Sequence, residues 1–191
     1  MTDVRDNSTM AELDGTAGIT LAGGCFWCLE AAFLLVDGVL EVTSGYAQGN
    51  VDHPTYAQVC TGRTGHAEAV RIRFAPSRVS LRQLLDVFFL IHDPTTRDRQ
   101  GADVGPQYRS GIYVERPEHE ALVRRYVEAL GESGRWGRGS IVTEIEPLRA
   151  FWPAEAEHQR YFERHPGQGY CQVVIAPKLE KLRHLPKPSP L

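Results

Sequence analysis

Hydrophobic residues recur along the chain with two different periods. In five segments apolar positions alternate with polar ones, or form a short apolar run that ends in glycine, and this pattern predicts β-strands. The predicted strands are 18–24, 39–49, 66–76, 111–115 and 141–148.

Four other segments carry their apolar residues three or four positions apart, which is the spacing of one helix face. The predicted helices are 25–38, 80–93, 117–130 and 154–165. Ser80 is a residue type that caps helices and Pro94 stops the helix that follows it. Since strands and helices interleave, the pattern indicates an α/β or α+β fold built on a mixed sheet.

The composition is that of one globular domain. With 191 residues, of which 42% are hydrophobic and 24% charged, the chain can bury one sizeable core but not two. The ends lack apolar periodicity, and the last eight residues include three prolines. We therefore expect a flexible segment at 1–16, a single domain at 17–183 and a proline-rich flexible tail at 184–191.

The charge pattern argues against two classes of partner. A net charge of −3, with basic residues spread along the chain, offers no general attraction for nucleic acid or anionic membranes. No apolar run approaches the roughly 20 residues that cross a bilayer, and the first residues contain no apolar signal segment. These features lead us to expect a cytoplasmic protein.

Cysteine chemistry is the most specific signal, because two of the four cysteines form a C-x-x-C pair in LAGGCFWCLE. The predicted strand, glycine turn and helix place Cys25 at the first turn of a helix, where free amides and the helix dipole stabilise an anion. A cysteine at such a position is expected to have a lowered pKa and to act as a nucleophile. The alternative is that Cys25 and Cys28 merely pack as small apolar residues.

A C-x-x-C pair also occurs in zinc sites and in disulfide oxidoreductases. A structural zinc site needs a second pair of ligands, but Cys60 and Cys171 are isolated and the histidines lack close ligand spacing. A thioredoxin-like disulfide oxidoreductase uses the same motif at a helix start. However, Phe26 and Trp27 would form an apolar wall that suits a small hydrophobic group better than a flat exchange surface.

The motifs of this chain occur in a characteristic order over roughly residues 19–182. They are GGCFWCLE, GYAQG, HPTYAQVCTGRTGHAEAV, LLDVFFLIHDPTTRDRQGADVGPQYRSGIY, TEIEPL, FWPAEAEHQRYF and GYCQVVIAPKLEK. This series resembles the peptide methionine sulfoxide reductases of the A class, which reduce the S epimer of methionine sulfoxide. Two features depart from the family: Gln48 stands where glycine is usual, and the tail lacks a glycine-rich end with extra cysteines.

The resemblance implies a fold and a set of catalytic roles. It implies an α+β two-layer sandwich, with a ferredoxin-like core and a mixed sheet flanked by helices. Cys25 would attack the sulfoxide sulfur, and Glu68 would protonate its oxygen. Tyr46 and Tyr108 would hydrogen-bond that oxygen, with Asp103 assisting through water. Burial would favour the protonated acid by raising the pKa of Glu68.

The resemblance also implies a substrate pocket and a redox cycle. Phe26 and Trp27 would hold the S-methyl group. The sulfenic acid formed on Cys25 would condense with a second thiol, for which Cys28 and Cys171 are equal candidates and Cys60, which fits the core as well, a lesser one. Thioredoxin or a similar dithiol protein would then reduce the disulfide, with no metal or bound cofactor. We expect a monomer.

Overall fold

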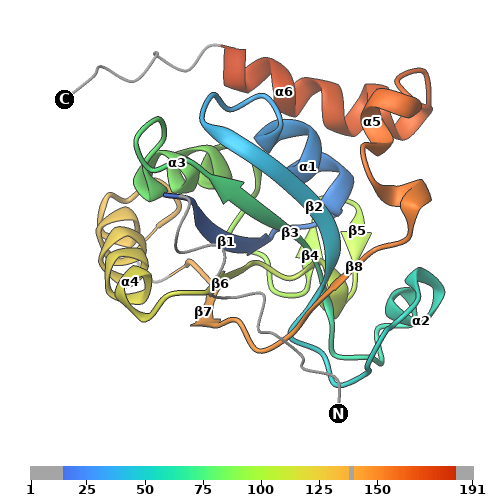
Figure 1. Cartoon of the computed structure of the whole chain (residues 1–191), viewed down its shortest axis with the longest axis horizontal. Coiled ribbons are helices and arrows are strands. Elements are labelled where there is room, and N and C mark those ends of the chain that lie inside the picture. Colours follow the sequence, from blue (N-terminus) through green and yellow to red (C-terminus); the bar gives the residue numbers. More distant parts are fainter. Residues whose placement is uncertain (1–14, 138–139, 184–191) are drawn as a thin grey trace.

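The computed structural model describes residues 15–137 and 140–183 (Figure 1). The flexible ends predicted at 1–16 and 184–191 lie almost entirely outside these residues. No helix within the described ranges is long and apolar enough to span a membrane.

Six strands form one mixed sheet in the order β7-β6-β1-β3-β2-β8. Their bounds are β1 Ala17–Ala22, β2 Val39–Ala47, β3 Ala67–Phe74, β6 Gly111–Val114, β7 Glu144–Pro147 and β8 Phe151–Pro153. All neighbours are antiparallel except β6 and β7, which are parallel. The four central strands, with β3 inserted between β1 and β2, have the split β-α-β arrangement of a ferredoxin-like core.

The helices cover one face of this sheet. Their bounds are α1 Phe26–Phe33, α2 Tyr56–Cys60, α3 Leu81–Ile91, α4 Pro117–Glu132, α5 Tyr161–Arg164 and α6 Ala176–Arg183. Helices α1, α3 and α6 pack against one another, and α4 packs on β6 and β7 at the sheet edge (Figure 1). As predicted, Ser80 caps α3, and its side chain and that of Gln83 form a capping box.

Alternation along the strands separates two faces, as the period of two requires. Large apolar residues such as Ile19, Leu21 and Ile72 join the core under the helices. The buried residues of the opposite face are alanines and Tyr113, and Leu148 and Phe151 pack against them. The fold is therefore the two-layer α+β sandwich that the resemblance implied.

The predicted helix over 154–165 is wrong. The chain instead makes a 3-10 turn at Ala156–His158, extends at Gln159 and passes through a left-handed residue, Arg160, before α5 begins. The interruption has a tertiary cause: the Gln159 amide hydrogen-bonds the backbone N–H and carbonyl of Ser44 on β2. These contacts outweigh the local helical preference.

Several short elements were not predicted. The loop over 95–110 contains a small hairpin, β4 Arg99–Gln100 and β5 Asp103–Val104, and a 3-10 turn at Pro106–Tyr108. Strand β8 and helix α2 were also missed. The glycine-flanked region after 167 forms a π-helical turn, Cys171–Ile175, that continues into α6.

Gln48 clamps the connection between β7 and β8 to the end of β2. Its backbone lies in the left-handed region, with φ of 68°, which explains why glycine suits this position. Its buried side chain donates to Glu146 Oε2 at 3.0 Å and to the Pro147 carbonyl at 3.1 Å. It also accepts from the Arg149 amide at 2.8 Å. These bonds hold β8 beside Tyr46.

Replacing Gln48 by glycine is expected to lower the stability of the fold. Glycine relieves a backbone strain of about 1 kcal/mol but loses three hydrogen bonds worth about 1 kcal/mol each, so the net loss is about 1–2 kcal/mol. Gln48→Ala loses the same bonds and keeps the strain, and should be less stable than Gln48→Gly by about 1 kcal/mol. Urea unfolding of both variants measures this. A Gln48→Gly protein as stable as the wild type would show that the side-chain bonds contribute nothing.

Candidate functional site

Cys25 lies at the start of α1, as predicted, and follows a tight glycine turn. It is the N-cap residue of the helix, and its side chain is 8% exposed. Gly24 has φ of +90°, and a Cβ there would lie 2.6 Å from Cγ of Gln100. Only glycine fits both the backbone angle and the close approach.

The predicted lowering of the Cys25 pKa is wrong. Burial raises the pKa of this thiol well above its ordinary value, and the neighbouring Cys28 and the charge of Glu68 add to the effect. The backbone amide of Trp27 opposes this and is outweighed. The helix N-terminus helps little because its first amide, Phe26 N–H, donates to Glu68 Oε2 at 3.1 Å. In the substrate-free site Cys25 is therefore a neutral thiol.

Cys28 is the thiol of the pair that ionises first. A hydrogen bond from Cys25 lowers the pKa of Cys28 to about 7, against the effect of burial and with help from the charge of Lys178 on α6. The Cys28 sulfur also lies 3.9 Å from the hydroxyl of Tyr170, a residue that the sequence did not single out. The Tyr170 hydroxyl donates to Asp103 Oδ2 at 2.8 Å, so Asp103 lies beside the cysteine pair.

Glu68 projects from β3 on the helix side of the sheet, directly opposite Tyr46 of β2. It is 1% exposed. While Oε2 accepts from the Phe26 amide, Oε1 has no hydrogen-bond partner in the described structure. Burial raises the pKa of Glu68 to about 8, although the Phe26 amide opposes this; the charges of Asp103 and Cys28 add to it. Glu68 is thus a protonated carboxylic acid at neutral pH.

The two predicted phenols lie around this acid in different ways. The Tyr46 side chain is fully buried, and its hydroxyl donates to Glu155 Oε2 at 2.6 Å. Tyr108 ends the 3-10 turn after β5 and is partly buried. Burial, followed by the negative charge of Glu68, raises the pKa of Tyr108, so its hydroxyl keeps its proton. Both phenols are neutral donors.

Phe26 and Trp27 belong to a cluster of aromatic rings at the start of α1. Phe26 is fully buried, and Trp27 stacks on Tyr161 of α5 with a centroid distance of 3.7 Å. The ring of His158 lies 5.6 Å from that of Phe26 and 5.7 Å from that of Trp27. The rings of Tyr170 and Trp27 are nearly perpendicular, and their centroids lie 6.0 Å apart. Phe26 and Trp27 therefore belong to one aromatic cluster, and their contact with the substrate stays a prediction.

Nothing in the sequence had singled out His158 and Tyr170 for the site. They come from the last third of the chain, more than 120 positions after Cys25. The one signal for them was the density of aromatic residues in FWPAEAEHQRYF and GYC. Aromatic density is equally typical of a core, so it did not place these residues at the site.

The two remaining cysteines differ in their surroundings. Cys171 is fully buried in the π-helical turn, and after burial the charge of Cys28 is the other contribution that raises its pKa. The turn that carries Cys171 packs against α1, the helix that carries Cys28. Cys60 is exposed at the end of α2, which corrects the core position considered for it. Within the described ranges, no group of three or more potential ligands could hold a metal ion.

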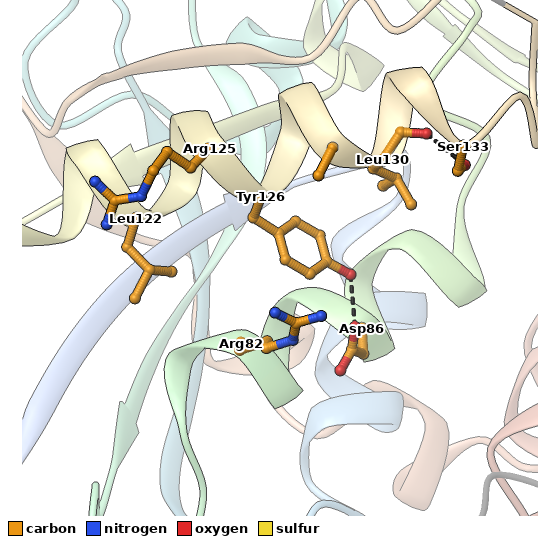
Figure 2. Close-up of a pocket in the computed structure, with 8 residues that line it drawn as sticks. Arg82, Asp86, Leu122, Arg125, Tyr126, Leu130 and Ser133 are labelled. Carbon is orange, nitrogen blue, oxygen red and sulfur yellow. Dashed lines mark hydrogen bonds between the residues drawn. The ribbon is translucent and has the colours of Figure 1, made fainter.

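A separate cavity lies between α3 and α4, away from these residues (Figure 2). Its volume is about 480 Å³, and Arg82, Arg125 and Tyr126 are among the residues that line it. Figure 2 shows the Tyr126 hydroxyl pointing at Asp86, to which it donates at 2.6 Å. No predicted site residue lines this cavity.

Comparison with known proteins identifies relatives of the whole domain. The sequence profile described as "Peptide methionine sulfoxide reductase" matches residues 17–188. A protein of Thermus thermophilus named peptide methionine sulfoxide reductase MsrA is 54% identical over 165 residues, covering 86% of this chain and 92% of the relative. The solved structure of methionine sulfoxide reductase A of Corynebacterium diphtheriae superposes with a TM-score of 0.78 at 38% identity, covering 84% of this chain and 79% of that one. Mxr1 of Saccharomyces cerevisiae, solved in complex with Trx2, matches with a TM-score of 0.55 at 29% identity, covering 84% of this chain and 90% of that one.

Proposed function

Because the chain belongs to the peptide methionine sulfoxide reductase family, whose activity it carries, we propose that Cys25 and Glu68 perform the chemical step. One observation supports this assignment above the others. Glu68 is a buried, protonated acid whose Oε2 binds the start of α1 while Oε1 remains unpartnered beside Cys25. A nucleophile and a proton donor with a free oxygen thus converge on one point. The thioredoxin-like alternative is set aside.

The reduction transfers one oxygen atom from substrate to enzyme. The Cys25 sulfur attacks the sulfoxide sulfur while Glu68 delivers its proton to the oxygen. The oxygen then resides on Cys25 as a sulfenic acid, methionine leaves, and the thiol proton of Cys25 restores Glu68. Methionine sulfur gains the two electrons that Cys25 sulfur loses. A sulfoxide oxygen is a poor leaving group, so its protonation is the step that Glu68 must supply.

The oxygen and the methyl group of the substrate would occupy opposite walls. We place the oxygen near Glu68 and Tyr108, with Asp103 holding the hydroxyl of Tyr170 at the same edge. The S-methyl group would lie against Phe26 and Trp27. Because the oxygen and the methyl group would be bound on different walls while Cys25 attacks from a third direction, the pocket would accept one epimer, which is the S epimer in this family. A bond from Tyr46 to the oxygen stays a prediction, since its hydroxyl donates to Glu155.

Cys28 is proposed as the thiol that resolves the sulfenic acid. It is hydrogen-bonded to Cys25, and its pKa of about 7 makes a large share of it a thiolate at neutral pH. Cys25 is an N-cap with ψ of 126°, outside the helical conformation, so the pair is not held at rigid helix spacing. Cys28 thiolate attacks the Cys25 sulfur, and the hydroxyl leaves as water after protonation. Cys171, in the turn that packs against α1, is then in a position to exchange into this disulfide.

One equivalent of the S epimer, added without reductant, tests this order. We expect Cys171→Ser to accumulate a Cys25–Cys28 disulfide, located by peptide mapping of the alkylated protein. Cys28→Ser should retain a sulfenic acid at Cys25, which a 1,3-diketone traps. In this variant the second thiol, Cys171, should be consumed at least about tenfold more slowly than the second thiol of the wild type. A Cys25–Cys171 disulfide formed in Cys28→Ser at the wild-type rate would instead make Cys171 the first resolving thiol.

The cycle requires an external dithiol but no group bound permanently to the protein. We propose thioredoxin or a similar dithiol protein as the reductant, supported by the structure of the related Mxr1 in complex with Trx2. A cytoplasmic location is proposed on the same chemistry, because all four cysteines are free thiols and the cycle needs them reduced. We also propose that the enzyme acts as a monomer, since every residue of the mechanism comes from one chain.

A further inference from the structure

Glu155 binds three segments that surround Phe26, and it has no role in the reaction proposed for Cys25 and Glu68. Its Oε2 accepts from the Tyr46 hydroxyl at 2.6 Å, and its Oε1 accepts from the Tyr56 amide at 2.8 Å. Its backbone carbonyl accepts from the amide of His158 at 2.9 Å. Glu155 is therefore bonded to β2, to the first residue of α2 and to the following 3-10 turn.

The side chains of the same three residues are ring neighbours of Phe26. The centroid of the Phe26 ring lies 5.8 Å from that of Tyr46, 6.3 Å from that of Tyr56 and 5.6 Å from that of His158. Tyr56 and His158 also contact each other, at 4.3 Å. Tyr46, Tyr56 and His158 belong to β2, to α2, which follows it, and to the 3-10 turn before α5, which comes much later in the chain. A single polar residue thus joins the elements that enclose Phe26.

The bonds of Glu155 are those of a carboxylate. Partial burial works to raise its pKa, but the hydrogen bonds from Tyr46 and the Tyr56 amide lower the pKa of Glu155 below its ordinary value. At neutral pH the group is ionised, so both side-chain bonds are charge-assisted and stronger than neutral ones. The single O–H of Tyr46 is committed to this acceptor, which fixes the orientation of the phenol.

We propose that Glu155 is a positioning residue of the substrate pocket. Its carboxylate fixes Tyr46 and Tyr56, and its carbonyl fixes His158, so the aromatic wall around Phe26 is assembled before the S-methyl group binds. A preassembled pocket saves the substrate the free energy of ordering these side chains, which is a contribution to affinity rather than to the chemical step. The inference rests on the proposed placement of the methyl group against Phe26 and Trp27.

Gln159 provides a matched control for a purely structural role of Glu155. It belongs to the same connection, four residues further on, and anchors it to β2 by bonds with the backbone N–H and carbonyl of Ser44 at 3.0 and 2.9 Å. Its amide also donates to the Ala154 carbonyl at 3.0 Å. All these partners are backbone atoms, so Gln159 holds the segment without holding any ring of the pocket.

The test compares Glu155→Ala, Glu155→Gln and Gln159→Ala, each as the full-length enzyme with dithiothreitol as reductant. For a peptide containing the S epimer, we expect Glu155→Ala to raise KM about tenfold or more and to change kcat by less than about threefold. Glu155→Gln should show a smaller rise in KM. Its amide oxygen can still accept from the Tyr56 amide, and its NH2 group can donate to the Tyr46 hydroxyl. Gln159→Ala should lower the melting temperature and leave KM within about threefold of wild type.

Two results would overturn the inference. The first is that folded Glu155→Gln and Glu155→Ala enzymes keep the wild-type KM. The second is that Gln159→Ala raises KM as much as Glu155→Ala at a matched fall in melting temperature, because anchoring the segment would then be sufficient. Failure of the proposed function is recognised separately, since wild-type enzyme would then leave the S epimer unreduced.

Discussion

Replacing Cys25 by serine is expected to abolish reduction of methionine sulfoxide, with a loss of more than about 10³-fold in kcat. A serine hydroxyl ionises far above the range of a thiol and cannot accept the sulfoxide oxygen to form a sulfenic acid. The structure gives no substitute at the same place, because the amide that binds Glu68 Oε2 belongs to Phe26, the residue next to Cys25, and Cys28 lies three residues further along the chain. Turnover of separate S and R epimers of a methionine sulfoxide peptide, driven by dithiothreitol, measures the effect.

Wild-type enzyme should convert the S epimer alone in the same assay, which fixes the stereochemistry as well as the nucleophile. Cys60→Ser is the matched control, since Cys60 is an exposed cysteine at the end of α2 and takes no part in the proposed cycle. It should keep kcat within about twofold of wild type. Retention of S-epimer turnover by a folded Cys25→Ser protein would remove Cys25 from the mechanism.

Glu68→Gln should retain substrate binding but lose about 10²- to 10⁴-fold in the rate of reduction, the range typical of a removed general acid. The amide is nearly the same size and can still accept the Phe26 amide, so the start of α1 is preserved. It cannot deliver a proton to the sulfoxide oxygen. Single-turnover formation of methionine, followed by rapid quenching, separates this step from resolution and recycling.

The pH dependence of the same step gives an independent check. Burial raises the pKa of Glu68 to about 8, so the acid is fully protonated well below that pH and is lost as the pH rises through it. The wild-type rate of the first step should therefore fall above about pH 8. In Glu68→Gln this alkaline limb should be absent. The control is Glu115→Gln, which breaks ion pairs with Arg71 and Arg73. These arginines lie on β3 but on the sheet face away from the helices and Glu68, so this variant should keep the wild-type pH profile.

Either of two outcomes would contradict the role of Glu68. An unchanged single-turnover rate in Glu68→Gln would assign the proton to another group. An alkaline limb that persists unchanged in the variant would show that a different ionisation controls the step. Asp103, whose charge helps to raise the Glu68 pKa, would be the next residue to replace.

Much of the fold could be predicted from local sequence patterns. The strands at β1, β2, β3, β6 and β7 and the helices α1, α3 and α4 agree with the segments that their periodicity indicated. The signals were the alternation of apolar and polar residues in the strands, an apolar stripe along the helices, and the capping box that begins with Ser80 in α3. Strand β8 and the interrupted helix around Gln159 were missed or wrong because their bonds go to β2, a distant segment of the chain.

The sequence by itself determined the family, through the order of its motifs, and predicted Cys25 as the nucleophile, through its place after a glycine turn at a helix start. Only the tertiary structure decided the protonation of the site and its completion. Burial in the core raises the pKa of Cys25 and keeps it a neutral thiol, and Glu68, which β3 brings to the first helical amide, adds to this effect. The ring of His158 and the carboxylate of Glu155 join the site from the last third of the chain. Burial and long-range contacts set pKa values and pocket walls, and neither is written in the local order of residues.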